Sequence, residues 1–303
     1  MSKIYIGAGG WTYFQVPGMD SLAAYAKAFD FVEVNSTFYT NPSIEMVRSW
    51  RRRVPDDFMF SVRCHKDLTH KYLLSPCRES YETLARSVRI CSELRAEILH
   101  IQTPMSFTPD DKLKDIRDLL SSIDFGAVKL AWEIRGRMGQ GTIELMRDLG
   151  IIHCADISRE LPAVDSNIMY SRLFGKGEHN LYQFDDAELV KIDERVIESN
   201  SGKAYLTFHG ARMYSDATRL KVYQKSGTFL KVTKAIGLES LRSALQEDAK
   251  FPASKSELIE KQGWKVIDLM ERDHVHASVL LEKLPDTIFE SVEEVVRDLN
   301  RIF

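Results

Sequence analysis

The stretch of sequence that determines the fold is FVEVNSTFY, residues 31–39. It begins with apolar, mostly β-branched or aromatic residues, which favour a strand, and it ends in polar ones. Because side chains of a strand point alternately to opposite faces, Glu33 and Asn35 share one face while Val32 and Val34 share the other. A carboxylate on such a strand is costly to bury unless it is paired or used in chemistry. The stretch therefore predicts a buried strand that ends in a polar site.

Two further stretches have the same order, apolar residues followed by charged ones: residues 132–135 (WEIR) and residues 155–156 (AD). Alternation puts both charged residues of WEIR on one face of their strand. The carboxyl ends of parallel strands meet at the same edge of a sheet or barrel. We therefore expect Glu33, Glu133 and Asp156 to converge on one polar site.

The rhythm of the chain predicts a barrel. Eight predicted strands alternate with mostly helical connections over about 240 residues, which is the pattern and size of a (β/α)8 TIM barrel. We predict this α/β barrel for residues 1–240, with an open doubly wound sheet as the alternative. The glycines of residues 7–10 do not complete the GxGxxG pattern of dinucleotide-binding folds, because Thr12 stands where the last glycine is required.

The last part of the chain has a different character. From residue 251 onward the sequence is acidic and indicates helices without strands. Ser254 and Glu257 have the spacing of a capping box, which marks the start of a helix. We expect residues 251–303 to form a separate, small all-α domain.

Composition limits the classes of function. The formal net charge of −3 gives no support to a broad nucleic-acid-binding surface. No apolar run is long enough to span a bilayer, and the first residues lack the layout of a signal peptide. The four cysteines show no CxxC spacing, which is typical of free thiols in a reducing compartment. We expect a cytoplasmic protein with no membrane partner.

Short motifs along the predicted barrel resemble those of one family. They are IGAGGW (6–11), VEVNSTFY (32–39), LTH (68–70), QTP (102–104), EIR (133–135), Asp156 and Arg172. Together they resemble the DUF72 (YecE-like) family of TIM-barrel proteins. The resemblance implies the barrel fold, and because that family is uncharacterised it implies no reaction.

Two positions depart from the family pattern. The seventh strand of the family tends to end in Arg-x-His-Gly, whereas residues 172–175 are RLFG, with Phe174 in place of the histidine. The eighth strand tends to end in Phe-Asn-Asn, whereas residues 208–210 are FHG, with His209 in the middle. A histidine lost from one strand and gained on its neighbour could be a positional exchange.

The C-terminal part resembles a second family. Residues 251–258 (FPASKSEL), 284–286 (LPD) and 289–291 (FES) resemble DUF2795, which is also a family of unknown function. The resemblance leaves the role of this module open, including any protein partner that it recruits.

We predict a functional site at the C-terminal ends of the barrel strands, where TIM barrels bind their ligands. Its predicted members are Trp11, Glu33, Asn35, Tyr39, Arg63, His65, His70, Gln102, Glu133, Arg135, Asp156, Arg172 and His209. In the favoured interpretation the site belongs to an enzyme that acts on an anionic, phosphorylated or nucleotide-like substrate. Its three arginines would hold oxyanions, because a guanidinium is planar and donates in bidentate fashion.

Acid/base chemistry follows from the remaining charged groups. Glu33 or Glu133 would act as the general base, and His65 or His209 as the general acid. The rings of Trp11 and Tyr39 could stack on a planar part of the ligand. The other binding positions are Asn35, His70, Gln102 and Asp156.

Three alternatives compete with this interpretation. Glu33, Glu133, Asp156 and His209 could hold a divalent metal, as in TIM barrels of the xylose isomerase and endonuclease IV type, although arginines in the same layer disfavour a cation. The site could instead bind a ligand without turnover. For a single charged pair, an ion pair that only fills the barrel is as good an explanation as function, whereas the whole cluster is an expensive way to fill a core.

Overall fold

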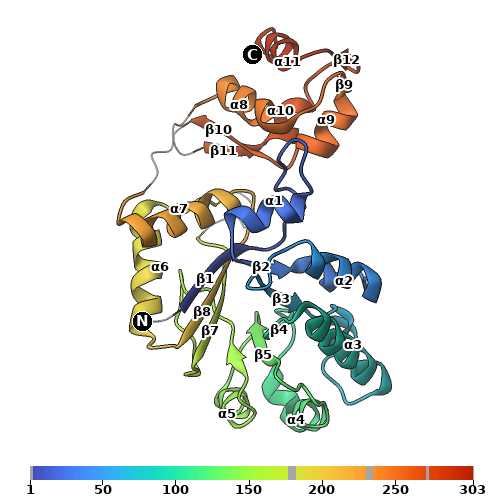
Figure 1. Cartoon of the computed structure of the whole chain (residues 1–303), viewed down its shortest axis with the longest axis vertical. Helices are drawn as coiled ribbons and strands as arrows, with labels where there is room; N and C mark the ends of the chain where they lie inside the picture. The colour runs from blue at the N-terminus through green and yellow to red at the C-terminus, as the bar shows by residue number, and fades with distance from the viewer. Residues whose placement is uncertain (1–2, 177–181, 230–234, 271–272, 303) are drawn as a thin grey trace.

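We describe a computed structural model of the chain (Figure 1), in which residues 3–176, 182–229, 235–270 and 273–302 are placed well enough to be described. Eight parallel strands form one sheet in the order β6-β5-β4-β3-β2-β1-β8-β7. Their bounds are Lys3–Ala8 (β1), Phe31–Val34 (β2), Met59–Arg63 (β3), Ile98–Thr103 (β4), Lys129–Ile134 (β5), Ile152–His153 (β6), Ile168–Leu173 (β7) and Lys203–Phe208 (β8). The predicted eight-stranded barrel is therefore confirmed.

Helices cover the outside of this barrel (Figure 1). Their bounds are Ser21–Ala28 (α1), Ile44–Arg52 (α2), Arg78–Leu94 (α3), Leu113–Ser121 (α4), Gln140–Asp148 (α5), Asp186–Glu198 (α6) and Met213–Ser226 (α7). Short helical turns follow three strands, at Asn35–Phe38 (η1), Asp67–Lys71 (η2) and Pro109–Lys112 (η3). Outward-facing strand residues such as Val32, Leu99 and Trp132 join the helices in one large core. Burial of this apolar surface is the main force that holds the helices on the barrel.

The inside of the barrel is built in layers, because every second residue of a strand points inward. The layer nearest the N-terminal ends of the strands is apolar and includes Tyr5, Phe31, Ile98, Ala131, Ile168 and Tyr205. Two residues further along their strands, Glu33, His100 and Tyr170 are fully buried. Another two residues on, Gln102 and Arg172 lie near the mouth. Polarity thus rises toward the C-terminal ends of the strands, as the first stretch of sequence predicts.

The barrel is irregular where β6 meets β7. Strand β6 has only two residues, Ile152–His153, and the described residues show no ladder pairing between β6 and β7. The Ser171 hydroxyl bridges this gap, since it donates to the Ala155 carbonyl at 2.8 Å and accepts from the Ile157 amide at 3.1 Å. A buried side chain thereby satisfies backbone groups that a ladder would otherwise pair.

The C-terminal module has its own core, which includes Leu241, Leu258, Leu281 and Val295. Its elements are Leu238–Asp248 (α8), Ala253–Ser254 (β9), Lys255–Gln262 (α9), Val266–Met270 (β10), Asp273–His276 (β11), Ala277–Leu281 (α10), Ile288–Phe289 (β12) and Val292–Asn300 (α11). We keep the name C-terminal module for residues 238–302.

The expectation of an all-α domain is wrong in one respect. The C-terminal module is mainly helical, but it contains two antiparallel two-stranded sheets, β10-β11 and β9-β12. Residues 266–270 (VIDLM) are short and start with β-branched residues, which pack as a strand on the helices of the module. The capping box at Ser254 and Glu257 is present as predicted. The resemblance to DUF2795 stays a prediction.

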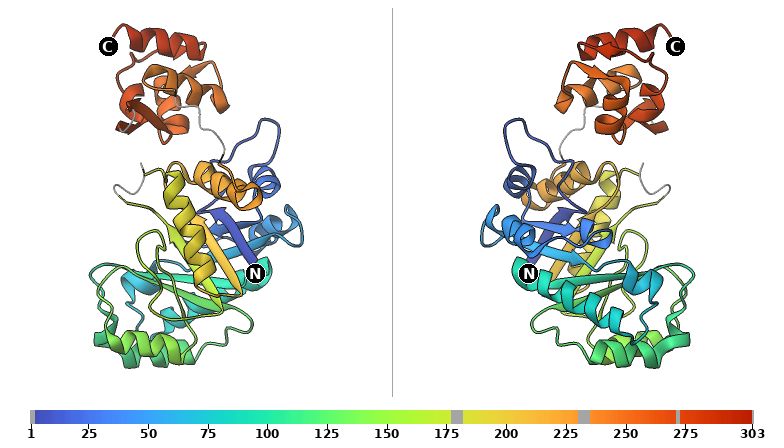
Figure 2. Two further views of the ribbon diagram at one scale, coloured as in Figure 1. Left: turned by 90° about the vertical axis from the view of Figure 1, so that its left-hand side faces the viewer. Right: turned by 90° about the vertical axis from the view of Figure 1, so that its right-hand side faces the viewer.

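The C-terminal module lies beyond one end of the barrel, next to the loop between β1 and α1 (Figure 1), and Figure 2 shows the same stacking from two sides. An ion pair links the two parts, with Arg212 Nη2 at 3.0 Å from Asp268 Oδ1. The rings of Tyr13 and Trp264 also meet, with centroids 4.5 Å apart. Within the described ranges, no helix has the length and apolar character that crossing a bilayer requires.

Candidate functional site

Arg172 connects the two glutamates that the sequence predicts to meet. Its guanidinium donates to Glu33 through Nε (3.0 Å) and Nη2 (3.2 Å), and to Glu133 Oε2 through Nη1 (2.5 Å). Arg172 is 3% exposed and Glu33 is fully buried, so this triad lies inside the barrel. Charge-assisted, bidentate hydrogen bonds of this kind are strong and fix geometry.

The arginine keeps both glutamates ionised. Burial opposes ionisation of Glu33, but Arg172, followed by His209 and His100, outweighs it and lowers the pKa of Glu33 to about 2. Burial acts in the same way on Glu133, where Arg172 and His100 hold the pKa well below its usual range. Arg135 Nε also lies 2.8 Å from Glu133 Oε1, as strand alternation predicts. Carboxylates of such low pKa are weak bases, which argues against the predicted general-base role of these two residues.

Arg63 is a buried cation held by amide oxygens. It is 5% exposed. Its Nη1 donates to Asn35 Oδ1 at 2.7 Å and its Nη2 donates to Gln102 Oε1, while its guanidinium carbon lies 3.5 Å from the centroid of the Phe38 ring. Within the described part of the chain, no carboxylate oxygen lies within ion-pair distance of this guanidinium. Burial and the like charge of Arg172 lower the pKa of Arg63 to about 10, so it stays charged at neutral pH.

His209 follows β8 and lies between the triad and the solvent-facing side of the site. Its Nε2 is 3.6 Å from Glu33 Oε1 and 3.4 Å from Thr207 Oγ1. Burial and Arg172 hold the pKa of His209 well below its usual value, so the imidazole is neutral. Gly9 leaves room for the ring, because a Cβ at this position would lie 2.3 Å from the imidazole. His209 also stacks on Phe174, with ring centroids 4.7 Å apart.

A cavity of about 510 Å³ opens above these groups at the C-terminal end of the barrel. Its lining contains three arginines (Arg63, Arg135 and Arg172), the histidines 70, 209 and 276, and several aromatic rings. None of the described residues that line it is an aspartate or a glutamate. A concave, positively charged site with aromatic walls is suited to an anion that carries a flat or apolar part.

The structure brings most of the predicted site residues to this cavity. The lining includes Asn35, Tyr39, Arg63, His70, Gln102, Arg135, Arg172 and His209. Glu33 and Glu133 lie directly below, bound to Arg172.

Three predicted residues are engaged elsewhere. Strand β3 ends at Arg63, so alternation does not extend to His65, whose ring lies 3.3 Å from the Tyr39 carbonyl oxygen and 3.7 Å from Asp67. The Trp11 ring packs edge-on against Trp50, with centroids 5.4 Å apart. Asp156 accepts hydrogen bonds from the backbone amides of residues 174 and 175, and thus shapes the loop that carries Phe174.

Sequence reasoning missed several residues of the site. His100 is not among the predicted site residues, yet it is buried between Glu33 and Glu133. A signal was present, because His100 and Tyr170 stand two residues before Gln102 and Arg172 and therefore share their strand faces. Trp264 and His276 of the C-terminal module also line the cavity, and no local sequence signal links them to it.

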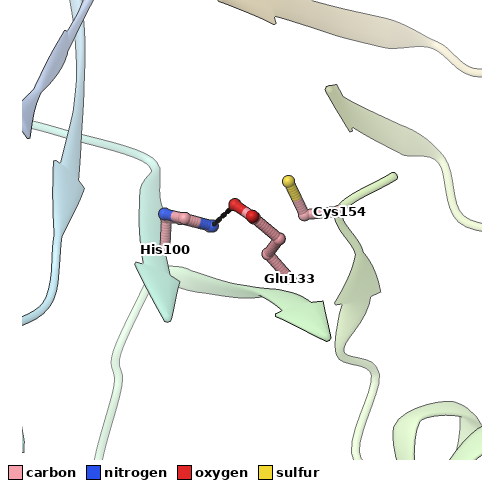
Figure 3. A group of neighbouring side chains, drawn as sticks. All are labelled: His100, Glu133 and Cys154. Carbon is pink, nitrogen blue, oxygen red and sulfur yellow. Dashed lines mark ion pairs between the residues drawn. The ribbon is translucent and has the colours of Figure 1, made fainter. Parts of the chain in front are cut away.

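One group of side chains has the composition of a metal site (Figure 3). In the part of the chain that the structure describes, this group is His100, Glu133 and Cys154, with ligand atoms all within 4.8 Å of one another. It differs from the set that the sequence suggested. His100 Nε2 lies 3.3 Å from Glu133 Oε2, a separation that fits two ligands of one zinc ion.

The electrostatics of the group do not fit a divalent cation. Arg172 Nη1 donates to the same oxygen of Glu133 at 2.5 Å, so a metal would have to displace a buried guanidinium. Burial and Glu133 raise the pKa of the Cys154 thiol well above its usual value, which keeps it protonated. A thiol must lose its proton to bind a metal. We therefore regard the group as part of the charged barrel interior.

Known proteins resemble part of this sequence, and others have a similar barrel fold. A 76-residue segment, 24% of this chain, is 37% identical to UPF0759 protein YecE of Escherichia coli K12 and spans 28% of that relative. A solved DUF72 family protein from Thermotoga maritima aligns over 74% of this chain and 100% of its own, with 21% identity and a TM-score of 0.58. SacUVDE aligns over 75% of this chain and 99% of its own, with 8% identity and a TM-score of 0.52, which shows the fold alone.

The model of the family "Protein of unknown function DUF72" matches residues 5–232, which is the barrel described above. The matched range contains the Glu33–Arg172–Glu133 triad, Arg63 and His209. The chain belongs to the DUF72 family.

Proposed function

We propose that the cavity at the C-terminal end of the barrel binds an anionic ligand with a phosphate or similar oxyanion group, and that the protein acts on this ligand by proton transfer. The observation that supports this most is Arg63, a buried guanidinium that lines the cavity. Among the described residues its hydrogen-bond partners are two neutral amide oxygens, those of Asn35 and Gln102, and its Nε has no partner. An unpaired buried charge is costly, and an anion bound in the cavity would remove that cost.

The two glutamates determine which arginines can bind the ligand. Glu33 and Glu133 neutralise Arg172 from below, so Arg63 and the half-exposed Arg135 are the cations with capacity left for a ligand. The ring of Phe174 lies beside the second of these cations, with its centroid 5.8 Å from the Arg135 guanidinium carbon. A doubly charged oxyanion matches two guanidinium groups better than a carboxylate does.

His209 is the group that we propose for proton transfer. It is neutral and lines the cavity. A bound oxyanion would raise the pKa of this imidazole, because a nearby negative charge favours its protonated form. His209 would then accept a proton from the ligand and return it later, while Glu33 at 3.6 Å stabilises the imidazolium. This assignment replaces the glutamates as the predicted base and leaves His65 outside the chemistry.

A thermal-shift screen with phosphorylated sugars and nucleotides, with and without EDTA, tests the proposal. Ligand binding to the folded state raises stability as RT ln(1 + [L]/Kd), so a true ligand gives a concentration-dependent shift. We expect a shift that persists in EDTA, falls with added salt, and is lost in Arg63→Met. Compounds that raise the melting temperature are then incubated with the protein, and mass spectrometry detects any product formed from them. The absence of any shift with phosphorylated compounds would overturn the proposed ligand class, and shifts only with added metal would favour the metal-dependent alternative.

A further inference from the structure

The C-terminal module contributes two side chains to the wall of the cavity. Trp264 and His276 line it together with residues that are more than fifty positions earlier in the chain, such as Tyr13 and His209. The module is thus part of the site, although the DUF72 match ends at residue 232. A barrel without such a module would have an open mouth at this position.

The position of the module is fixed close to the proposed proton-transfer group. Arg212 is three residues after His209 and donates from Nη2 to Asp268 Oδ1 at 3.0 Å and to the Val266 carbonyl at 3.3 Å. The carboxylate of Asp268 is also bound by His274 Nδ1 at 2.6 Å. These contacts hold the start of β10, and with it Trp264, above the mouth of the barrel.

The two side chains present complementary chemistry to the cavity. Trp264 is half-buried, its indole NH donates to the Lys261 carbonyl at 3.0 Å, and its ring lies 4.5 Å from that of Tyr13 at an angle of 33°. His276 Nδ1 lies 3.0 Å from the Trp264 carbonyl oxygen. Because a carbonyl can only accept, Nδ1 is the donor and Nε2 is left for a ligand.

We propose that the C-terminal module completes the ligand site. The packed Trp264–Tyr13 ring pair would offer an aromatic surface to a planar ring of the same ligand whose phosphate the barrel arginines bind. The inference rests on the proposed function, and it narrows the ligand to a phosphorylated compound with an aromatic base, such as a nucleoside monophosphate. A volume of about 510 Å³ is sufficient for a ligand of this size. Stacking of an aromatic side chain on a base contributes about 1–3 kcal/mol, or roughly five- to 150-fold in affinity.

Isothermal titration calorimetry with two probes tests the inference on the full chain. Adenosine 5′-monophosphate and ribose 5-phosphate share the phosphate and the sugar and differ in the base. We expect the wild type to bind the monophosphate at least about fivefold more tightly, and Trp264→Ala to remove this preference while ribose 5-phosphate binds as before. Trp264→Phe keeps a ring and should retain most of the preference, and Ile288→Ala, an exposed change elsewhere in the module, should have no effect.

The outcomes separate the two proposals. If the wild type binds both probes equally, or if Trp264→Ala and Tyr13→Ala keep the full preference for the monophosphate, the role of the module is wrong while the arginine site stands. If the wild type binds neither probe, the arginine site fails for this ligand class and the inference fails with it. Circular dichroism and melting temperature identify a variant that has lost its fold, and Tyr13→Ala then provides the test.

Discussion

The ring of Phe174 stacks on the ring of His209, with centroids 4.7 Å apart and planes inclined by 19°. Both residues are among those at which the sequence departs from the pattern of the resemblance to DUF72, and both line the cavity. The loss of a histidine on β7 and its gain on β8 therefore concern neighbouring side chains. A histidine at either position would present an imidazole to the same cavity.

This proximity makes the exchange testable. We expect the double variant Phe174→His with His209→Asn, which moves the histidine from one position to the other, to keep ligand affinity within about threefold, because the imidazole moves only to the adjacent stacked position. His209→Asn alone should keep affinity and lose turnover, since the proton-transfer group is missing. Calorimetry and product analysis measure the two quantities. Equal turnover in His209→Asn and the wild type would remove His209 from the chemistry.

The pKa of Glu33 predicts how stability depends on pH. The folded-state pKa is lowered to about 2 from the 4.5 of an ordinary glutamate, so this carboxylate stabilises the fold above pH 4.5 and its contribution is lost as the pH falls toward 2. Between pH 6 and pH 3 the loss amounts to about 2 kcal/mol in the free energy of unfolding. Urea unfolding at both pH values should therefore show a smaller difference for Glu33→Gln than for the wild type. The exposed Glu144→Gln is the control, and an equal pH dependence in all three proteins would contradict the assignment.

The ion pairs of Arg172 and Arg135 predict very different costs of removal. Arg172→Met leaves the fully buried carboxylate of Glu33 without its arginine and removes one of the two arginines that bind Glu133, and we expect a loss of about 3–5 kcal/mol in the free energy of unfolding. Arg135 also binds Glu133, but its side chain is 40% exposed. We expect Arg135→Met to cost at most about 1 kcal/mol. Chemical denaturation measures both, and similar values for the two variants would mean that the Arg172 network does not hold the barrel interior together.

The group His100, Glu133 and Cys154 leads to a prediction about metal. Because Arg172 occupies Glu133 Oε2 and the Cys154 thiol is protonated, we expect zinc to bind no more tightly to the wild type than to Cys154→Ser. Elemental analysis of protein dialysed against zinc, together with the melting temperature in EDTA, measures this. Cys91→Ser serves as a control for the loss of a buried thiol. One equivalent of zinc that is retained in the wild type and lost only in Cys154→Ser would establish a metal centre.

The parts of the molecule that sequence could predict are those that follow strand periodicity. Alternation placed Glu33 on the inner face of β2 and predicted the contact between Glu133 and Arg135. Alternation also puts His100 on the same face of β4 as Gln102, although His100 was not predicted to belong to the site. The role of His65 stays a prediction. Strand β3 ends at Arg63, and the His65 ring lies beside the Tyr39 carbonyl and Asp67 and not among the residues that line the cavity.

Contacts between distant parts of the chain could not be predicted from the sequence. The role of Trp264 depends on how the C-terminal module sits on the barrel, which Arg212 and Asp268 determine through side-chain contacts that no local pattern encodes. The bridging function of Arg172 could not be predicted either, because the predicted site contains three arginines and several acids, and the sequence does not reveal which of them pair. The unpaired state of Arg63, on which the proposed function rests, appears only once these pairs are known.

The central claim is that Arg63 binds an oxyanion of the ligand, and calorimetric titration of ribose 5-phosphate into the wild type and Arg63→Met tests it most directly. A hydrogen bond to a charged group contributes about 1.5–3 kcal/mol, so we predict affinity that is roughly ten- to 150-fold weaker in the variant, and a weaker dependence on salt. Lys114→Met, which removes an exposed cation on α4, should bind as the wild type does. Equal affinity in the wild type and Arg63→Met would contradict the account.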